Sequence, residues 1–442
     1  MADLDTADPV RHGDPPAVPG VRTRFPLGVW PVALPASAIT AVVVAATWSM
    51  RSWPYQEWVR TSAEFHQQNT FTAPIAAAAA TYFAGRLLPP SRIFALPSAA
   101  RAGLRTAVPQ LGLLVGAFVG AYLLGLAPLV VVTLRDAESG GLDVGAALTG
   151  LLGLALATAF GYLVGVVTRT SLTAPLSFVL LFGAAVAGSG GDRFSALMPV
   201  LHLEPPLGLV QSTPFVAYRL AFLTVSTVAV VWAVVGLLRR HRVSGSLFRS
   251  AAALLPLLLP VVVAVPPLWS TPALFAYETE PVHVCRTSGT VEYCVHEGHR
   301  SRLDIVVAAT EAALQRSGRP APFTRIRDEA LRGYPIDRTP VWSPEAKDTI
   351  LWVTIQPSSP TDDRPTSAVN VLSGLAGCFG RRENADPRSA ELALELGRWL
   401  DGTAAPENSF VDLPEPVVQQ WIASNGDRIA GCALTPETLP RR

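Results

Sequence analysis

The position of the four cysteines relative to one apolar stretch constrains this chain more than any other feature. The first 284 residues contain no cysteine, whereas the last 158 contain Cys285, Cys294, Cys378 and Cys432. A basic cluster at 239–249 and an uncharged stretch at 250–270 precede the change. At 1.5 Å per residue this stretch can cross a hydrocarbon core of about 30 Å. Because basic clusters favour the cytoplasmic face and paired cysteines favour an oxidising compartment, the stretch sets the orientation.

The composition is that of a membrane protein. Charged residues make up 16% of the chain and apolar residues 50%, whereas a soluble domain has about 25% charged residues. A formal net charge of +1 gives no electrostatic reason to expect nucleic acid as a partner. Lys347 is the only lysine, and the residues before it do not form the GxxxxGK[ST] phosphate loop. Any ATP-driven process would therefore need the ATPase of another subunit.

The apolar segments predict a polytopic α-helical membrane protein with about seven transmembrane helices. We expect a cytoplasmic N-terminal segment at 1–27, a transmembrane bundle at 28–270 and an extracytoplasmic domain at 271–442. The expected spans are 28–49, 71–88, 106–134, 144–168, 171–190, 215–238 and 250–270.

Arginine placement predicts an inside N-terminus. With that orientation twelve arginines fall in inner segments and five in outer ones, the boundary residue Arg219 included, which is a positive-inside bias. An odd number of spans then puts the cysteine-containing C-terminal domain outside, as the cysteines require.

The predicted spans contain almost no ionisable residues, which argues against coupling to proton or sodium flow. They do contain glycines at helical spacing. GxxxG stripes let helix backbones approach closely, either within one bundle or between subunits. The stripes are Gly112, Gly116 and Gly120 in the third span and Gly161 and Gly165 in the fourth.

Two loops differ from ordinary connections. The inner loop 89–105 is basic and joins the second and third spans. The expected outer loop 190–214 is too apolar for a free loop, and we expect it to form short re-entrant helices, since apolar irregular backbone near a membrane is normally shielded.

The C-terminal domain is expected to be mixed α/β. A two-residue turn at Gly289-Thr290 would place Cys285 opposite Cys294 in a hairpin, as a non-hydrogen-bonded pair close enough for a disulfide. That register leaves Cys378 to pair with Cys432. A helix is expected over 301–316, another over 386–402 with Asp386 as its N-cap, and a buried strand over 349–355.

The sequence supports no catalytic or cofactor site in this chain. His296 and His299 are three residues apart, whereas the zinc-hydrolase motif HExxH needs four, and no GxSxG nucleophile motif occurs. A structural zinc site made of Cys285, Cys294 and two of the nearby histidines is the alternative to a disulfide with solvated or locally bonded histidines.

Topology and several short motifs give a resemblance to a family. The inside N-terminus, six core spans, basic inner loop and apolar loop before span six resemble the permease subunit of type-2 ATP-binding-cassette (ABC) exporters. The segments ALPSAARAGLR, CVHEGHRSRL and AGCALTPETLP are similar to an actinobacterial branch with a seventh span and an extracytoplasmic C-terminal domain. The resemblance extends over most of the chain.

The resemblance implies a transport function in the cell membrane. The chain would be a permease that works as a homodimer or heterodimer with a separate ABC ATPase subunit and exports an amphipathic or lipid-like substrate. The loop at 89–105 would couple to the ATPase, with Arg92, Pro97, Ser98, Arg101 and Arg105 as contact candidates. Alternatively, these arginines only anchor the loop to anionic lipid headgroups. The alternative function is a membrane-anchored extracytoplasmic sensor or binding protein.

Overall fold

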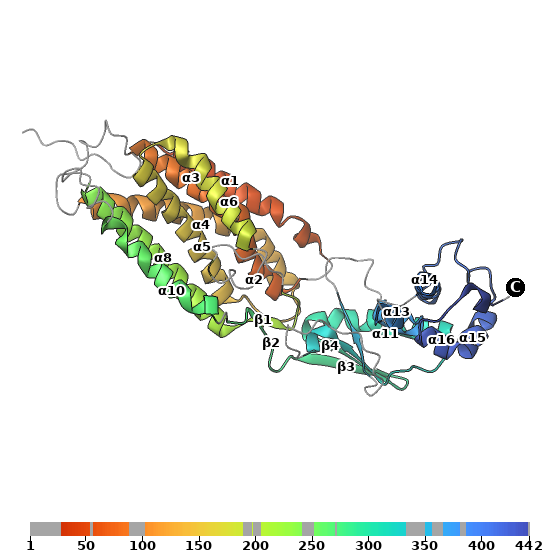
Figure 1. The fold of residues 1–442 in the computed structure, drawn as a ribbon. Helices are drawn as coiled ribbons and strands as arrows, with labels where there is room; N and C mark the ends of the chain where they lie inside the picture. Colours follow the sequence, from red (N-terminus) through yellow and green to blue (C-terminus); the bar gives the residue numbers. More distant parts are fainter. Residues whose placement is uncertain are drawn as a thin grey trace, which may run out of the picture.

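The computed structural model describes residues 28–53, 56–87, 102–188, 197, 205–240, 252–269, 272–332, 350–355, 366–380 and 386–440. A helical bundle forms one end of an elongated molecule, and an α/β region forms the other (Figure 1). The helices of the bundle are α1 (Trp30–Ala46), α2 (Trp58–Gln67), α3 (Asn69–Leu87), α4 (Ala102–Asp136), α5 (Val144–Thr168), α6 (Ala174–Gly188), α8 (Thr213–Arg240) and α10 (Leu258–Trp269). Short 3-10 turns lie at Ser49–Ser52, Ser171–Thr173 and Leu255–Leu257.

Helices α3 and α5 form the centre of the bundle because small residues let their backbones approach. A Cβ placed on Gly161 would collide with the backbone of Ala77, and one on Gly165 would meet Ala84 at 2.7 Å. The Thr81 hydroxyl donates to the carbonyl of Gly161 at 2.8 Å. The second glycine stripe, Gly161 and Gly165, therefore packs inside the bundle. Of the two alternatives for such stripes, this is packing within one bundle and not between subunits.

The glycines of α4 lie differently. Nothing comes within 4 Å of a Cβ built on Gly112, Gly116 or Gly120. Helix α4 instead meets α1 through Gly125, where a Cβ would lie 2.7 Å from Val43. The first stripe therefore faces away from the neighbouring helices that the structure describes.

Within the residues that the structure describes, four helices are long and apolar enough to cross a membrane, which marks the chain as a membrane protein. By length and composition these spans are Trp30–Ser52, Ala107–Asp136, Val144–Thr168 and Thr213–Leu238. The apolar segments Ser171–Ala187 and Ala252–Ala264 are shorter. Helix α3 is long enough but less apolar, since Asn69, Arg86 and several threonines lower its mean hydropathy. The count of seven spans and the direction of the chain stay predictions.

A two-stranded sheet connects the bundle to the α/β region. Strand β1 (Leu209–Gln211) immediately precedes α8, and it pairs antiparallel with β2 (Phe275–Tyr277), which follows α10. Of the loop expected to be re-entrant, 190–196 and 198–204 lie outside the described residues. The described end of that loop is β1, an extended segment and not a helix.

The α/β region contains a four-stranded mixed sheet in the order β3-β4-β5-β6. Strands β3 (His283–Ser288) and β4 (Val291–His296) form an antiparallel hairpin, while β5 (Arg325–Asp328) and β6 (Ile350–Val353) continue the sheet in parallel. Helix α11 (Leu303–Ser317) links β4 to β5, as a parallel pair requires. Its apolar face contributes Leu303, Val306 and Val307 to the core on the sheet.

A second, helical core completes this region. Its helices are α12 (Thr366–Leu372), α13 (Leu375–Gly380), α14 (Pro387–Asp401), α15 (Glu415–Ser424) and α16 (Gly426–Ala430), with 3-10 turns at Glu297–Arg302, Glu329–Leu331 and Pro436–Thr438. Leu396, Leu400, Phe410 and Ile422 lie at its centre. Asp386 caps α14 by accepting from the Arg388 backbone N–H, and Gly402 ends the helix in the left-handed region, as the sequence predicts.

Both expected disulfides are present. Cys285 is the register partner of Cys294 across the hairpin, with Cα atoms 4.1 Å apart. Cys378 on α13 is bonded to Cys432 near the C-terminus, with Cα atoms 5.0 Å apart. The first disulfide closes the hairpin, and the second ties the end of the chain to the helical core.

Candidate functional site

The most unusual element of the bundle is α2, a short helix with a continuous run of buried residues, most of them polar. Every residue from Thr61 to Gln67 is buried. Helix α2 lies at the end of the bundle that meets β1, β2 and the α/β region (Figure 1). Since buried polar groups are costly unless they form hydrogen bonds, a helix of this kind indicates a specific role.

Other bundle helices form several hydrogen bonds with α2. The hydroxyl groups of Thr61 and Thr133 are 2.6 Å apart. The Tyr122 hydroxyl lies 3.1 Å and 3.0 Å from the carbonyls of Glu64 and Phe65. A Cβ on Gly150 of α5 would collide with the Phe65 carbonyl, so this glycine permits α2 to approach α5 closely.

The N-terminal end of α2 contacts the α/β region through a cluster of charged groups, which we call the His299 cluster: the buried Glu57, His299 and Asp328 and the partly exposed Arg60. His299 Nδ1 lies 2.5 Å from a carboxylate oxygen of Asp328, and its Nε2 lies 3.3 Å from one of Glu57. The side chains of His299, Glu57 and Asp328 are 3%, 2% and 2% exposed, so solvent screens these contacts weakly.

Each carboxylate in the cluster is bonded on both oxygens. Glu57 also accepts from Arg60 Nε at 2.9 Å. The second oxygen of Asp328 accepts from the backbone N–H of Ala330 at 3.0 Å. The cluster therefore contains two carboxylates, one guanidinium and one imidazole. Its negative and positive charges cancel when the imidazole is protonated.

The surroundings favour the protonated imidazole. Burial alone would lower the pKa of His299, but hydrogen bonds to Asp328 and Glu57, together with their charges, outweigh burial and raise this pKa to about 9. At neutral pH His299 is therefore an imidazolium that donates through Nδ1 to Asp328 and through Nε2 to Glu57. This cation joins the bundle to the α/β region.

The C-terminal end of α2 meets β1. His66 Nε2 lies 3.1 Å from Nε2 of Gln211 and 3.3 Å from the hydroxyl of Thr149. Burial and the charge of Arg219 lower the pKa of His66 well below its usual value, so this ring is neutral. Arg219, which was expected at a span boundary, lies in the second turn of α8 and is fully buried.

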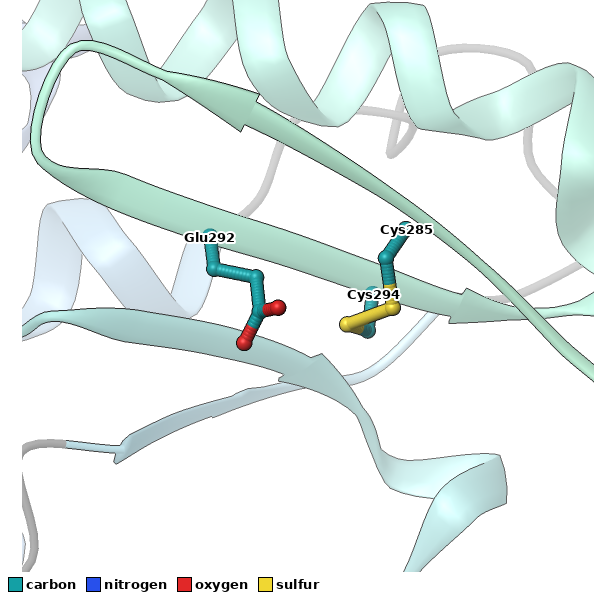
Figure 2. Close-up of side chains that lie close together, drawn as sticks. All are labelled: Cys285, Glu292 and Cys294. Carbon is teal, nitrogen blue, oxygen red and sulfur yellow. A yellow bond between two sulfur atoms is a disulfide. The ribbon is translucent and has the colours of Figure 1, made fainter.

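The histidines do not form a zinc site in the described part of the chain. His296 Nδ1 accepts from the Gly298 backbone, its Nε2 lies 3.1 Å from Glu278, and both nitrogens of His299 contact carboxylates. Figure 2 shows Cys285, Glu292 and Cys294 together on the hairpin, where the cysteines are joined in a disulfide. Disulfide sulfurs lack the thiolate that binds zinc, so this trio offers a metal only one carboxylate.

His296 and His299 were expected to be either solvated or locally hydrogen-bonded. They are 5% and 3% exposed and therefore not solvated, and His296 accepts a local hydrogen bond from the Gly298 backbone. His299 is buried because the end of the bundle covers it. No local sequence pattern indicates this contact, since Glu57 and His299 are 242 positions apart. The one available signal is the polar, amphipathic segment WVRTSAEFHQ between two apolar spans.

The candidate residues for ATPase coupling cannot be placed in the same way. Arg92, Pro97, Ser98 and Arg101 lie outside the described residues, and Arg105 lies in the first turns of α4. Their proposed role stays a prediction.

Comparison of the chain with protein-family models, curated proteins and solved structures gives no match.

Proposed function

We propose that this chain is the permease subunit of an ABC-type exporter in the cell membrane, with ATP hydrolysed by a separate subunit. The depth of packing in the bundle supports this most directly. In the most apolar part of α5, 67% of the residues are buried, against 22% in α1. A helix that only anchors a domain needs no such protein surroundings, because lipid can cover it.

The proposed orientation puts the N-terminus in the cytoplasm and the α/β region outside. The two disulfides support an oxidising compartment for that region. The basic loop at 89–105 would then face the cytoplasm, where it could contact the ATPase.

An amphipathic or lipid-like molecule is the substrate class that fits the spans best. The four long helices expose many large apolar side chains, among them Leu124, Val131, Leu134 and Trp232, while their acidic residues are confined to Asp136 at the end of α4. Proton- or sodium-coupled carriers normally place carboxylates inside their spans.

A sensor remains the second candidate function, and the His299 cluster favours it, since a signal received by the α/β region would reach the bundle through α2.

Purification of the tagged full chain from native membranes in mild detergent separates the two functions. The permease predicts a stoichiometric P-loop ATPase, and the sensor predicts a kinase or regulator. Recovery of the chain without an ATPase would contradict the permease.

Matched variants test the coupling loop. Replacement of Arg92, Arg101 and Arg105 by glutamine is expected to reduce ATPase recovery at least about tenfold, since each arginine can form charge-assisted hydrogen bonds. The control replaces Arg11, Arg22 and Arg24, which lie on the same expected side of the membrane. Equal loss in both variants would mean that the loop acts only through positive charge near the membrane.

A further inference from the structure

The α/β region contacts one end of α2, and the two-stranded sheet that connects this region to the bundle contacts the other. At the start of the helix, Glu57 accepts from His299, which lies after β4. At the other end, His66 contacts Gln211 in β1, and β1 pairs with β2 at the entrance to the α/β region. A displacement of this region would therefore act on both ends of one ten-residue helix.

Helix α2 fills the end of the bundle. It packs on α4 and α5, and its burial continues without a break from Thr61 to Gln67. The close approach at Gly150 leaves no room for even one additional methyl group between α2 and α5.

The segment that joins α2 to α3 contains buried polar atoms without a hydrogen-bond partner in the described part of the protein. Within the described residues, His66 Nδ1, Gln68 Oε1 and Thr70 Oγ1 are buried without a hydrogen bond from the protein. Gln211 Oε1, beside His66, is a further buried atom of this kind. These atoms contribute no hydrogen bond within the protein that would hold this segment in place. Helix α2 is therefore held by hydrogen bonds from α4 and α5 along its length and by the contacts at its two ends, and these atoms of the joining segment add nothing to them.

We propose that the α/β region is a gate: docked through the His299 cluster, it keeps α2 seated in the bundle, and when it undocks, α2 swings out about Gln68. Helix α3 stays in place during this movement, since the Asn69 amide donates to the carbonyl of Gly150 at 2.7 Å and Thr81 bonds to α5. That the opening would admit or release a transported molecule rests on the proposed permease function. The movement itself does not.

A thiol on the buried face of α2 reports the movement. All four native cysteines are in disulfides, so Ser62→Cys provides a single free thiol at a position that is 2% exposed. The full chain in lipid nanodiscs, open on both faces, is treated with a bulky water-soluble maleimide. Labelling should be slow, and His299→Gln or Asp328→Asn should accelerate it at least about tenfold, since each removes a charge-assisted hydrogen bond.

Two controls separate opening from general damage. Arg286→Gln breaks an exposed ion pair with Asp304 in the same region and should leave the labelling rate unchanged. Thr158→Cys places the thiol in α5, at a position that is 0% exposed, and it should stay unreactive when His299 is replaced.

The gate is supported if Ser62→Cys becomes reactive while Thr158→Cys does not. It is refuted if His299→Gln leaves the Ser62→Cys rate unchanged, or if both thiols become reactive together, because the cluster would then hold the whole bundle and not α2. Since the nanodiscs contain no ATPase, either result is independent of the permease assignment.

Discussion

Glu57 and His299 lie 242 positions apart in the chain, yet a carboxylate oxygen of Glu57 is 3.3 Å from His299 Nε2. Both side chains are almost fully buried. Buried charges persist only where they are paired, so the bundle supplies one half of a pair that the α/β region needs. The two parts therefore form one structure and are not a bundle with a tethered domain.

Removing the imidazole should destabilise the protein strongly. His299→Gln leaves Glu57 and Asp328 buried with one cation fewer, and loss of a partner from a buried ion pair costs about 3–5 kcal/mol. Thermal unfolding of the detergent-solubilised chain measures this. Arg286→Gln, which breaks an exposed pair, should cost less than about 1 kcal/mol. Equal Tm values for the two variants would contradict the role of the cluster.

Stability should also fall as the pH rises through the pKa of His299. That pKa is about 9 in the folded protein and 6.5 in the unfolded chain. The stabilisation is therefore complete below pH 6.5 and is lost as the pH rises past 9, by an amount on the order of 3 kcal/mol. The difference in Tm between the wild type and His299→Gln, followed from pH 6 to pH 10, isolates this contribution. A constant difference would show that His299 is not protonated.

The two glycine stripes should respond differently to alanine. Gly161→Ala forces a methyl group into the Ala77 backbone, and overpacking of this kind costs about 1–3 kcal/mol. Gly116→Ala meets nothing within 4 Å and gains helix propensity, so it should not destabilise the single chain. The Tm values of the Gly161→Ala and Gly116→Ala variants in detergent test this difference. A loss of oligomer with Gly116→Ala at unchanged monomer stability would assign the α4 stripe to a subunit interface.

Local sequence signals predicted the local structure well. The Gly289-Thr290 turn fixed the register of Cys285 and Cys294, because a two-residue turn leaves only one pairing. Asp386 and Gly402 marked the ends of α14 for equally local reasons. In each case the residues that determine the geometry are neighbours in the sequence.

Contacts between distant segments were not predictable in this way. The spacing of His296 and His299 excluded a zinc-hydrolase motif, but nothing near them indicates Glu57 as a partner. The sequence placed Arg219 near the end of a span but could not show that its side chain is fully buried, because hydropathy carries no information on helix packing. The contact of His299 needed the packing of the bundle end against the α/β region.

The two disulfides should differ in their contribution to stability. In the chain-entropy model the stabilisation rises with the length of the loop that is closed, giving about 4 kcal/mol for Cys378–Cys432 and about 3 kcal/mol for Cys285–Cys294, at sequence separations of 54 and 9. The paired serine variants, compared by chemical unfolding under oxidising conditions, measure both. A larger loss from the Cys285/Cys294 variant would show that the hairpin disulfide has a role beyond loop closure.

The orientation of the chain can be tested with reporters fused after the last residue. If the α/β region lies outside, a phosphatase that folds only in oxidising compartments should be active at that position, and a fluorescent protein that matures only in the cytosol should be dark. Fusions after Arg240, where the basic cluster predicts the cytoplasm, should give the opposite pair of results. The two positions control for each other, because both fusions use the same reporters and the same bundle. A fluorescent C-terminus would place the disulfides in a reducing compartment and would refute the proposed topology together with the exporter assignment that depends on it.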